Sequence, residues 1–152
     1  MKELFALLPT VSGSGHTFID TCFFLWLLEH DALHKLEKVS DPVFCSFTCD
    51  ELVLVEHRIS EKKSELRHYL KNCSLSRFVI PVHPGDVLGE KSFVASIEPR
   101  LLELVADPSD AVLAAAALQT RSHILTRDKH HLFTSALDNF FHERGISVSN
   151  KI

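Results

Sequence analysis

The sequence predicts an α/β protein, with three layers (α/β/α) around a central parallel sheet of about five strands. Short apolar runs, typical of strands, alternate with longer segments whose apolar residues recur at helical spacing. Turns rich in proline, glycine and aspartate separate them. An alanine-rich segment near residue 115 indicates a thin helix that can pack close to a sheet. This alternation implies βαβ crossover connections, which place successive strands parallel.

The expected strands are short, apolar and bounded by turn residues. They cover 16–21, 43–47, 77–82, 122–126 and 146–148. The expected helices lie between and after these strands, and the third is interrupted near Pro99. They cover 22–36, 48–71, 87–105, 108–120 and 133–144. Gly145 follows the last helix, where a C′ glycine is common.

Length and turn signals predict one main domain. A chain of 152 residues is long enough to bury a core of its own. The run Val11-Ser-Gly-Ser-Gly15 is typical of a turn or linker, so we expect residues 1–15 to form an N-terminal extension. Its first eight residues are apolar enough to pack as a short arm or helix. Residues 16–152 then form a single domain.

Composition argues against several classes of protein. The formal net charge of −4 disfavours a protein that holds nucleic acid mainly by bulk positive charge. Residues 1–9 lack a long apolar core after a basic region, so we expect no signal peptide. The longest apolar stretch, 22–28, is too short to span a bilayer. The four cysteines form no CxxC pair, which fits a reducing cytoplasmic setting.

Four acidic residues each close or follow a short apolar run. They are Asp20, Glu51, Asp110 and Asp128. Asp20 and Asp128 end expected strands, and Glu51 and Asp110 fall in the first turn of expected helices. Because sites in parallel sheets form beyond the carboxyl ends of the strands, the four can converge. Crowded carboxylates repel one another unless a divalent cation lies among them, so the pattern indicates a metal site.

Each acid also has a purely structural explanation. Asp20 suits the N-cap of the following helix, and Asp128 suits a turn. Thr48 and Glu51 have the spacing of a capping box. Asp107 suits an N-cap before Pro108, which explains Asp107 better than Asp110. Asp50 and Glu56 are rivals of Glu51 as the helix-borne ligand.

The order of these blocks resembles the PIN domain of metal-dependent ribonucleases. The matching blocks are Phe18-Ile19-Asp20-Thr21, Asp50-Glu51-Leu52, Ser109-Asp110-Ala111 with its alanine helix, and Ile124-Leu125-Thr126-Arg127-Asp128. The resemblance covers roughly residues 16–150, and its last two blocks are the most specific. Residues 1–15 are extra relative to the compact family pattern.

The resemblance implies a hydrolase that cuts RNA with Mg²⁺ or Mn²⁺. Asp20, Asp110 and Asp128 would be the principal ligands, with Glu51 helping through a water and Thr126 as a supporting polar group. Such ions prefer carboxylate oxygens, activate a bound water and neutralise charge in the transition state. Thr21, Arg127 and Lys129 are the expected substrate contacts, and His130 and His131 lie beside them.

The resemblance leaves the biological role open. The chain would be either the toxin of a VapC-type toxin–antitoxin pair, with an antitoxin protein as partner, or a stand-alone RNA-processing nuclease. A homodimer is expected by resemblance, and no membrane partner is expected. A non-catalytic PIN-like binding module is the alternative from a different class.

Two other sets of residues suggest a zinc site and a substrate-binding helix. His30 and His34 are spaced i, i+4, which suits zinc, and Cys45 and Cys49 are near enough in sequence to join such a site. Four basic residues mark the later half of the second helix: Arg58, Lys62, Lys63 and Arg67. Acidic residues alternate with them, which favours a solvated, salt-bridged face over a substrate grip.

Overall fold

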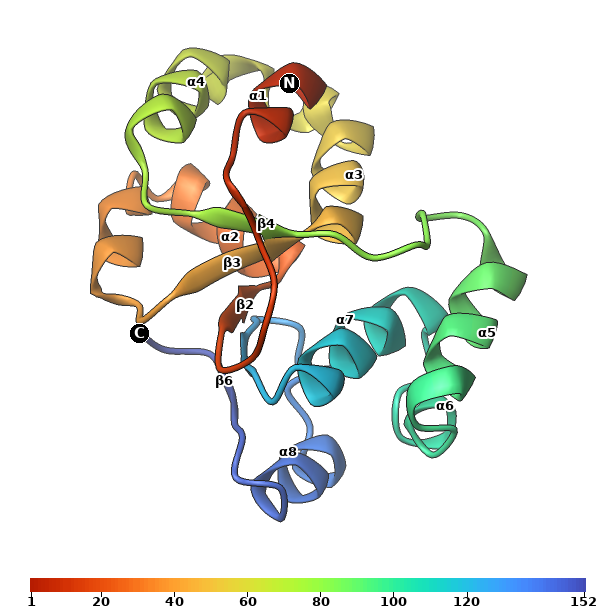
Figure 1. The fold of residues 1–152 in the computed structure, drawn as a ribbon. Helices are drawn as coiled ribbons and strands as arrows, with labels where there is room; N and C mark the ends of the chain where they lie inside the picture. The colour runs from red at the N-terminus through yellow and green to blue at the C-terminus, as the bar shows by residue number, and fades with distance from the viewer.

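The computed structural model describes residues 1–152 and contains one six-stranded, all-parallel sheet (Figure 1). The strand order is β1-β4-β3-β2-β5-β6. The strands are β1 (Thr10–Val11), β2 (Thr17–Ile19), β3 (Pro42–Cys45), β4 (Ser76–Phe78), β5 (His123–Leu125) and β6 (Val148–Ser149). The predicted α/β class and parallel sheet are therefore confirmed, with six strands in place of about five.

Helices cover both faces of this sheet. The α-helices are α1 (Lys2–Ala6), α2 (Thr21–Glu29), α3 (Ser46–Leu54), α4 (Lys63–Asn72), α5 (Val87–Ile97), α6 (Leu101–Leu104), α7 (Pro108–Gln119) and α8 (Ser135–His142). Two 3₁₀ helices are η1 (Leu33–Lys38) and η2 (Glu56–Lys62). None of these helices is long and apolar enough to cross a lipid bilayer.

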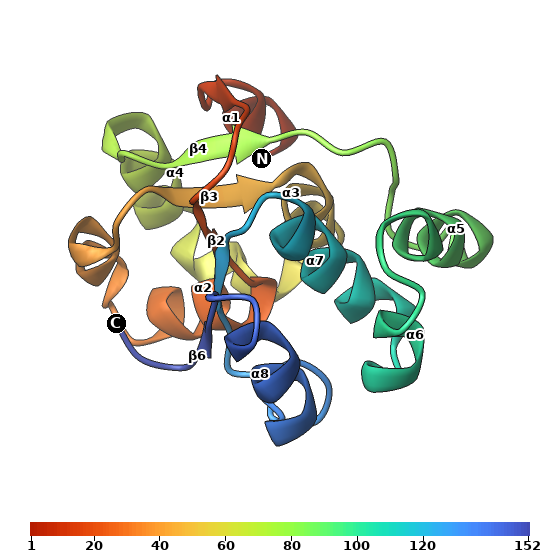
Figure 2. The ribbon, with the colours of Figure 1, turned by 60° about the horizontal axis from the view of Figure 1, so that its bottom comes forward.

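Successive strand residues feed two separate cores. Phe18 and Ile124 pack with α5 to α8, whereas their neighbours Ile19 and Leu125 pack with α1 to α4. Side chains alternate between the faces of a strand, so every position of a doubly covered sheet must be apolar. Figure 2 shows α7 beside α5 and α6, with α8 on the same side of β2. The two cores make the three layers.

Strand order reverses at β2, and this reversal positions the site. From β2 the chain moves outward through β3 to β4, and β5 then returns to the other side of β2. The connections after β2 and β5 consequently leave in opposite directions and open a crevice at their carboxyl ends. Asp20 directly follows β2, and Asp128 lies three residues after β5.

The N-terminal segment, expected as an extension of the domain, packs against it. β1 pairs in parallel with β4 and supplies the sixth strand. The Phe5 ring lies edge-on to Phe44 of β3, with ring centroids 6.0 Å apart. Phe5 is only 2% exposed and belongs to the core under α2 to α4. Residues 1–11 therefore complete one core and one sheet edge.

Two predicted helices are divided in the structure. The segment 22–36 was expected to be one helix, but α2 ends at Glu29 and Asp31 has a positive φ of 51°. A left-handed backbone at that position cannot continue an α-helix. The segment 48–71 starts earlier, at Ser46, and breaks after Leu54, with Ile59 in a non-helical conformation. These expected boundaries were wrong.

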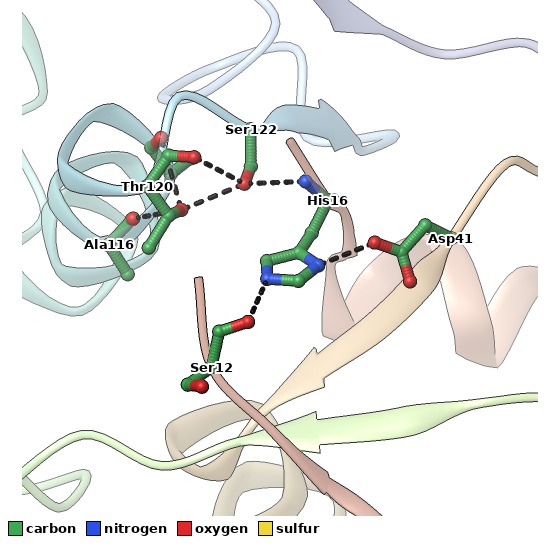
Figure 3. Close-up of polar contacts among 7 residues, drawn as sticks. Ser12, His16, Asp41, Ala116, Thr120 and Ser122 are labelled. Carbon is green, nitrogen blue, oxygen red and sulfur yellow. Dashed lines mark hydrogen bonds and ion pairs between the residues drawn. The ribbon is translucent and has the colours of Figure 1, made fainter. Parts of the chain in front are cut away.

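A buried histidine joins the amino ends of the strands (Figure 3). The His16 ring lies between the Asp41 carboxylate (Nδ1 to Oδ2, 2.6 Å) and the backbone carbonyl of Ser12 (Nε2 to O, 3.2 Å). The Ser122 hydroxyl accepts from the backbone N–H of His16 and bonds to Thr120, so it does not face the imidazole. Serine, histidine and aspartate here form a structural junction rather than a nucleophilic triad.

Replacing Phe5 tests whether the N-terminal segment is part of the core. We expect Phe5→Ala to lower the free energy of unfolding by about 3–5 kcal/mol, since it leaves a cavity against Phe44. Leu7 lies just after the same helix but is 73% exposed, so Leu7→Ala is expected to change stability by less than about 0.5 kcal/mol. Urea unfolding measures both. Equal stability of the two variants would contradict the packing described.

Candidate metal-binding active site

The four acids singled out in the sequence line one cleft. Asp20, Glu51, Asp110 and Asp128 border a hollow of about 350 Å³ at the carboxyl ends of β2 and β5. They come from the end of β2, from α3, from the first turn of α7 and from the loop after β5. Thr21, Cys22, Leu25, Val55 and Arg58 complete its lining. The sheet topology therefore brings together acids that lie far apart in the sequence.

Asp20 is the most deeply placed and most firmly held of these acids. Its Oδ1 accepts from the Thr21 backbone N–H at 2.8 Å. Its Oδ2 accepts from the Thr126 hydroxyl at 2.7 Å and from the Cys22 thiol at 2.9 Å. Burial raises the pKa of Asp20, and these three hydrogen bonds oppose the rise. Asp20 is thus the N-cap of α2 and a fixed carboxylate of the cleft at once.

Thr126 links the two strand ends. The backbone N–H of Asp20 donates to the Leu125 carbonyl, which continues the ladder between β2 and β5 past their ends. This pairing sets the buried Thr126 hydroxyl against Asp20, while the same hydroxyl accepts from the Asp128 backbone N–H at 3.0 Å. Thr126 therefore holds Asp20 and the start of the next loop in register. It donates to one acid and orients the backbone of another, which agrees with the supporting role that the family resemblance implies.

Asp128 shapes its own loop. Its Oδ1 accepts from the backbone N–H groups of His130 and His131, at 3.0 and 3.2 Å. This leaves Oδ2 without a protein donor, and the negative charge of Asp128 is one of the causes that raise the pKa of Asp110. The explanation of Asp128 as a turn residue is correct, and the same side chain also borders the cleft.

Glu51 points into the cleft from the middle of α3. The helix begins at Ser46 after Cys45, so Thr48 is not its N-cap and the capping-box explanation was wrong. Instead, the Thr21 hydroxyl donates to Glu51 Oε1 at 2.9 Å. Burial, and next the negative charges of Asp20, Asp107 and Glu90, raise the pKa of Glu51 to about 7. Glu51 is therefore partly protonated near neutral pH.

Asp110 lies in the first turn of α7, and its pKa is strongly raised. Asp107 caps α7 through its bond from the Ser109 N–H, and Pro108 occupies N1, as expected. Asp110, at N3, makes no capping bond of that kind. Burial raises its pKa to about 8, and the charges of Asp20, Asp128 and Asp107 add to the rise. At neutral pH this carboxyl therefore keeps a proton unless a positive charge replaces it.

A second, overlapping group of ligand atoms includes a histidine. Asp107, Asp110 and His131 each offer one atom, and these atoms lie within 4.8 Å of one another. The sequence reading placed His131 only among possible phosphate contacts. Asp110 belongs to both groups. The oxygens of Asp20, Asp110 and Asp128 do not come this close together as a group of three, although all three side chains line the cleft. Their donors are nevertheless all oxygen, which a hard cation prefers, and Asp20 is already fixed by three hydrogen bonds.

The expected substrate contacts are separated in the structure. Thr21 bonds to Glu51 and lines the cleft. Arg127 is exposed and turns away from the acids, with its guanidinium 4.2 Å from the centre of the Trp26 ring. Lys129 is exposed on the loop beyond. Arg58 lines the cleft, whereas Lys62 and Lys63 form ion pairs, so the salt-bridged reading holds for only part of that basic segment.

Two residues near the acids were missed by sequence reasoning. Cys22 donates to Asp20, and burial next to that carboxylate raises the pKa of the thiol to about 12, so it stays a donor. Its only sequence signal is its position two residues after Asp20. Glu90 of α5 is buried and accepts from the Gly85 N–H and the Ser109 hydroxyl, which ties α5 to the start of α7. Nothing in its local sequence indicates burial.

The rival ligands lie elsewhere. Asp50 bonds to His83, and Glu56 pairs with Lys63, so Glu51 is the acid that α3 presents to the cleft. For the zinc alternative, His30 caps the end of α2 while His34 belongs to η1, so their i, i+4 spacing is not realised on one helix. Both candidate cysteines are buried, and they belong to the cores on opposite faces of the sheet.

The raised pKa of Asp110 gives a pH-dependent stability. The folded state holds its proton up to about pH 8, whereas the unfolded chain releases it near 3.8. Stability from this group is therefore full below pH 4 and is lost as pH rises to 8. In EDTA, we expect the melting temperature of Asp110→Asn to exceed that of the wild type by a margin that widens from pH 4 to 8. Glu103→Gln, an exposed acid on α6, is the control, and thermal melts at stepped pH measure the margin. A constant margin would show that Asp110 is not strained.

The chain was compared with protein-family models and with curated proteins. Neither a protein-family model nor a curated protein matches the chain. What the cleft does must therefore be inferred from its residues and from their arrangement at the switch in strand order.

Proposed function

We propose that this protein is a metal-dependent endoribonuclease that hydrolyses RNA phosphodiester bonds at the four-carboxylate cleft. The observation that carries the proposal is the convergence of four carboxyl groups, those of Asp20, Glu51, Asp110 and Asp128, on one cleft. A fold gains nothing from such crowding, whereas a divalent cation converts the repulsion into binding. The resemblance of the surrounding blocks to PIN-domain ribonucleases supports the same activity.

The residues of the cleft fit Mg²⁺ or Mn²⁺. Asp20, Asp110 and Asp128 offer carboxylate oxygens, and no imidazole or thiolate is among these three. Such hard oxygen donors suit these ions, which keep several waters and rarely need a full protein cage. The hollow of about 350 Å³ leaves room for those waters and for a phosphate group. The side chains that would hold the ion are thus Asp20, Asp110 and Asp128.

The chemistry then divides between the ion and the chain. When bound, the ion would lower the pKa of a water and neutralise charge on the phosphate in the transition state. Glu51 Oε2 has no hydrogen-bond donor from the protein, and the pKa of Glu51 near 7 suits a group that accepts a proton at neutral pH. Thr21 orients Glu51, and Thr126 with Cys22 orient Asp20. Arg58, at the rim, supplies a positive charge for the phosphate.

Removing one carboxylate charge tests this proposal. We expect Asp110→Asn to reduce Mn²⁺-dependent cleavage of a generic single-stranded RNA by at least about 10²-fold, as for loss of one electrostatic group in other enzymes. Asp20→Asn is expected to have the same effect and to remain folded. Cleavage is followed on a labelled RNA by gel, with circular dichroism as the test of folding.

Glu51→Gln and Asp50→Asn form a matched pair on adjacent residues. Glu51 lines the cleft, while Asp50 bonds to His83 outside it, so only the first is expected to slow cleavage. Equal cleavage by wild type and the Asp20 and Asp110 variants, or cleavage that persists in EDTA, would refute the metal-dependent nuclease. A folded wild type that binds RNA without ever cutting it would favour the non-catalytic module.

A further inference from the structure

Beside the acidic cleft lies a second hollow of opposite charge. Its volume is about 320 Å³. It is lined by Phe23, Trp26, Leu27, Lys35, Arg127, Asn150, Lys151 and Ile152. Three of these side chains carry positive charge, and none carries a carboxylate. In a chain with a net charge of −4, three basic side chains therefore gather in one hollow without an acidic side chain among them.

Three distant segments build this cationic hollow. Lys35 comes from η1, Arg127 from the loop after β5, and Lys151 from the segment after β6. The backbone of Lys151 exchanges hydrogen bonds with the Ser149 hydroxyl, which ties that segment to the end of β6. None of the three cations has a carboxylate within ion-pair distance. Their charges are therefore available to a ligand.

The Trp26 ring holds the Arg127 guanidinium in an orientation that suits such a ligand. The guanidinium lies over the indole, 4.2 Å from the ring centre, and the His30 ring stacks on the same indole at 4.7 Å. A stacked guanidinium keeps its in-plane N–H groups free, and these match the oxygens of a phosphate. Phe23 and Leu27 are buried and form the floor of the hollow, while Ile152, which is 47% exposed, adds apolar surface that the face of a base can cover. Cations beside apolar surface are the usual elements of a single-strand binding site.

The cationic hollow and the acidic cleft share a wall. Arg127 lies between Thr126 and Asp128, and its backbone N–H donates to the Cys22 sulfur of the cleft at 3.3 Å. Cys22 lines the cleft, and the next residue, Phe23, lines the hollow. If the scissile phosphate of a single-stranded RNA lies at the acids, a neighbouring phosphate of the same RNA would therefore lie near Arg127, Lys35 and Lys151.

We infer that the hollow around Trp26, Lys35, Arg127 and Lys151 is the subsite that holds single-stranded RNA next to the cleavage site. The inference rests on the proposed nuclease function, and it assigns the grip on the substrate that the acids cannot supply. The larger hollow of the protein, about 590 Å³ beside α4, contains Asp31, Glu37 and Glu65 and would repel a phosphate backbone.

Binding in EDTA tests the subsite apart from cleavage. The chain has a single tryptophan, Trp26, so its fluorescence reports occupancy of this hollow directly. We expect a short single-stranded RNA to change that fluorescence with the same dissociation constant that anisotropy of the labelled RNA gives. Lys35→Ala/Lys151→Ala is expected to weaken binding roughly tenfold at 0.1 M salt. It should also reduce the slope of log K against log [salt] by about 1.4, or 0.7 for each lost phosphate contact.

The matched control is Lys71→Ala/Lys91→Ala, which removes two exposed, unpaired lysines from α4 and α5 and has the same net charge. If both double variants bind RNA equally, if wild-type Trp26 fluorescence does not respond to RNA, or if poly-glutamate competes as well as RNA does, the inference is overturned.

Cleavage assays separate this outcome from failure of the nuclease. If the wild type never cuts RNA but Lys35→Ala/Lys151→Ala still weakens RNA binding, the nuclease is refuted and the subsite stands. Normal KM for RNA in an active Lys35→Ala/Lys151→Ala enzyme would keep the nuclease and refute the subsite.

Discussion

Mutual repulsion among carboxylates at the reversal of strand order is the constraint on which the rest of the structure depends. Asp20 cannot move away, because Thr21, Thr126 and Cys22 fix both of its oxygens. Asp110 cannot move away without disturbing the start of α7, which Asp107 caps. Holding these carboxyl groups together costs stability once Asp110 loses its proton, which agrees with the cation site that we propose.

The sequence predicts the inner sheet and the acids better than it predicts the helices. Strand-forming runs such as Val43-Phe44-Cys45 are apolar on both faces, and that pattern survives in any doubly covered sheet. Helix boundaries depend on single residues, such as Asp31 with its positive φ, and on tertiary contacts that no local pattern records. The strand at Thr10–Val11 was missed for the same reason, since two residues carry no period.

The site shows a similar division. Asp20, Asp110 and Asp128 follow from strand ends and a helix start, which the topology brings to one edge. Cys22, Glu90 and His131 acquire their positions only from packing and from the loop that Asp128 organises. Arg127 was expected to contact the substrate beside Asp128. Side chains alternate along the extended segment, so Arg127 points to the side opposite to Thr126 and Asp128 and lies over Trp26. Two consecutive residues, Arg127 and Asp128, therefore line the positive hollow and the negative cleft respectively.

The outermost strands of the sheet have a further consequence for self-association. β1 and β6 contribute only two residues each, so each border offers few unpaired backbone groups to a neighbouring molecule. Short borders protect a sheet from continuous growth by addition of strands. If two copies of the chain assemble, pairing of these edge strands would therefore contribute little to their contact. The apolar side chains that remain outside, such as Leu54 on α3 and Leu88 on α5, are the natural places for such contact.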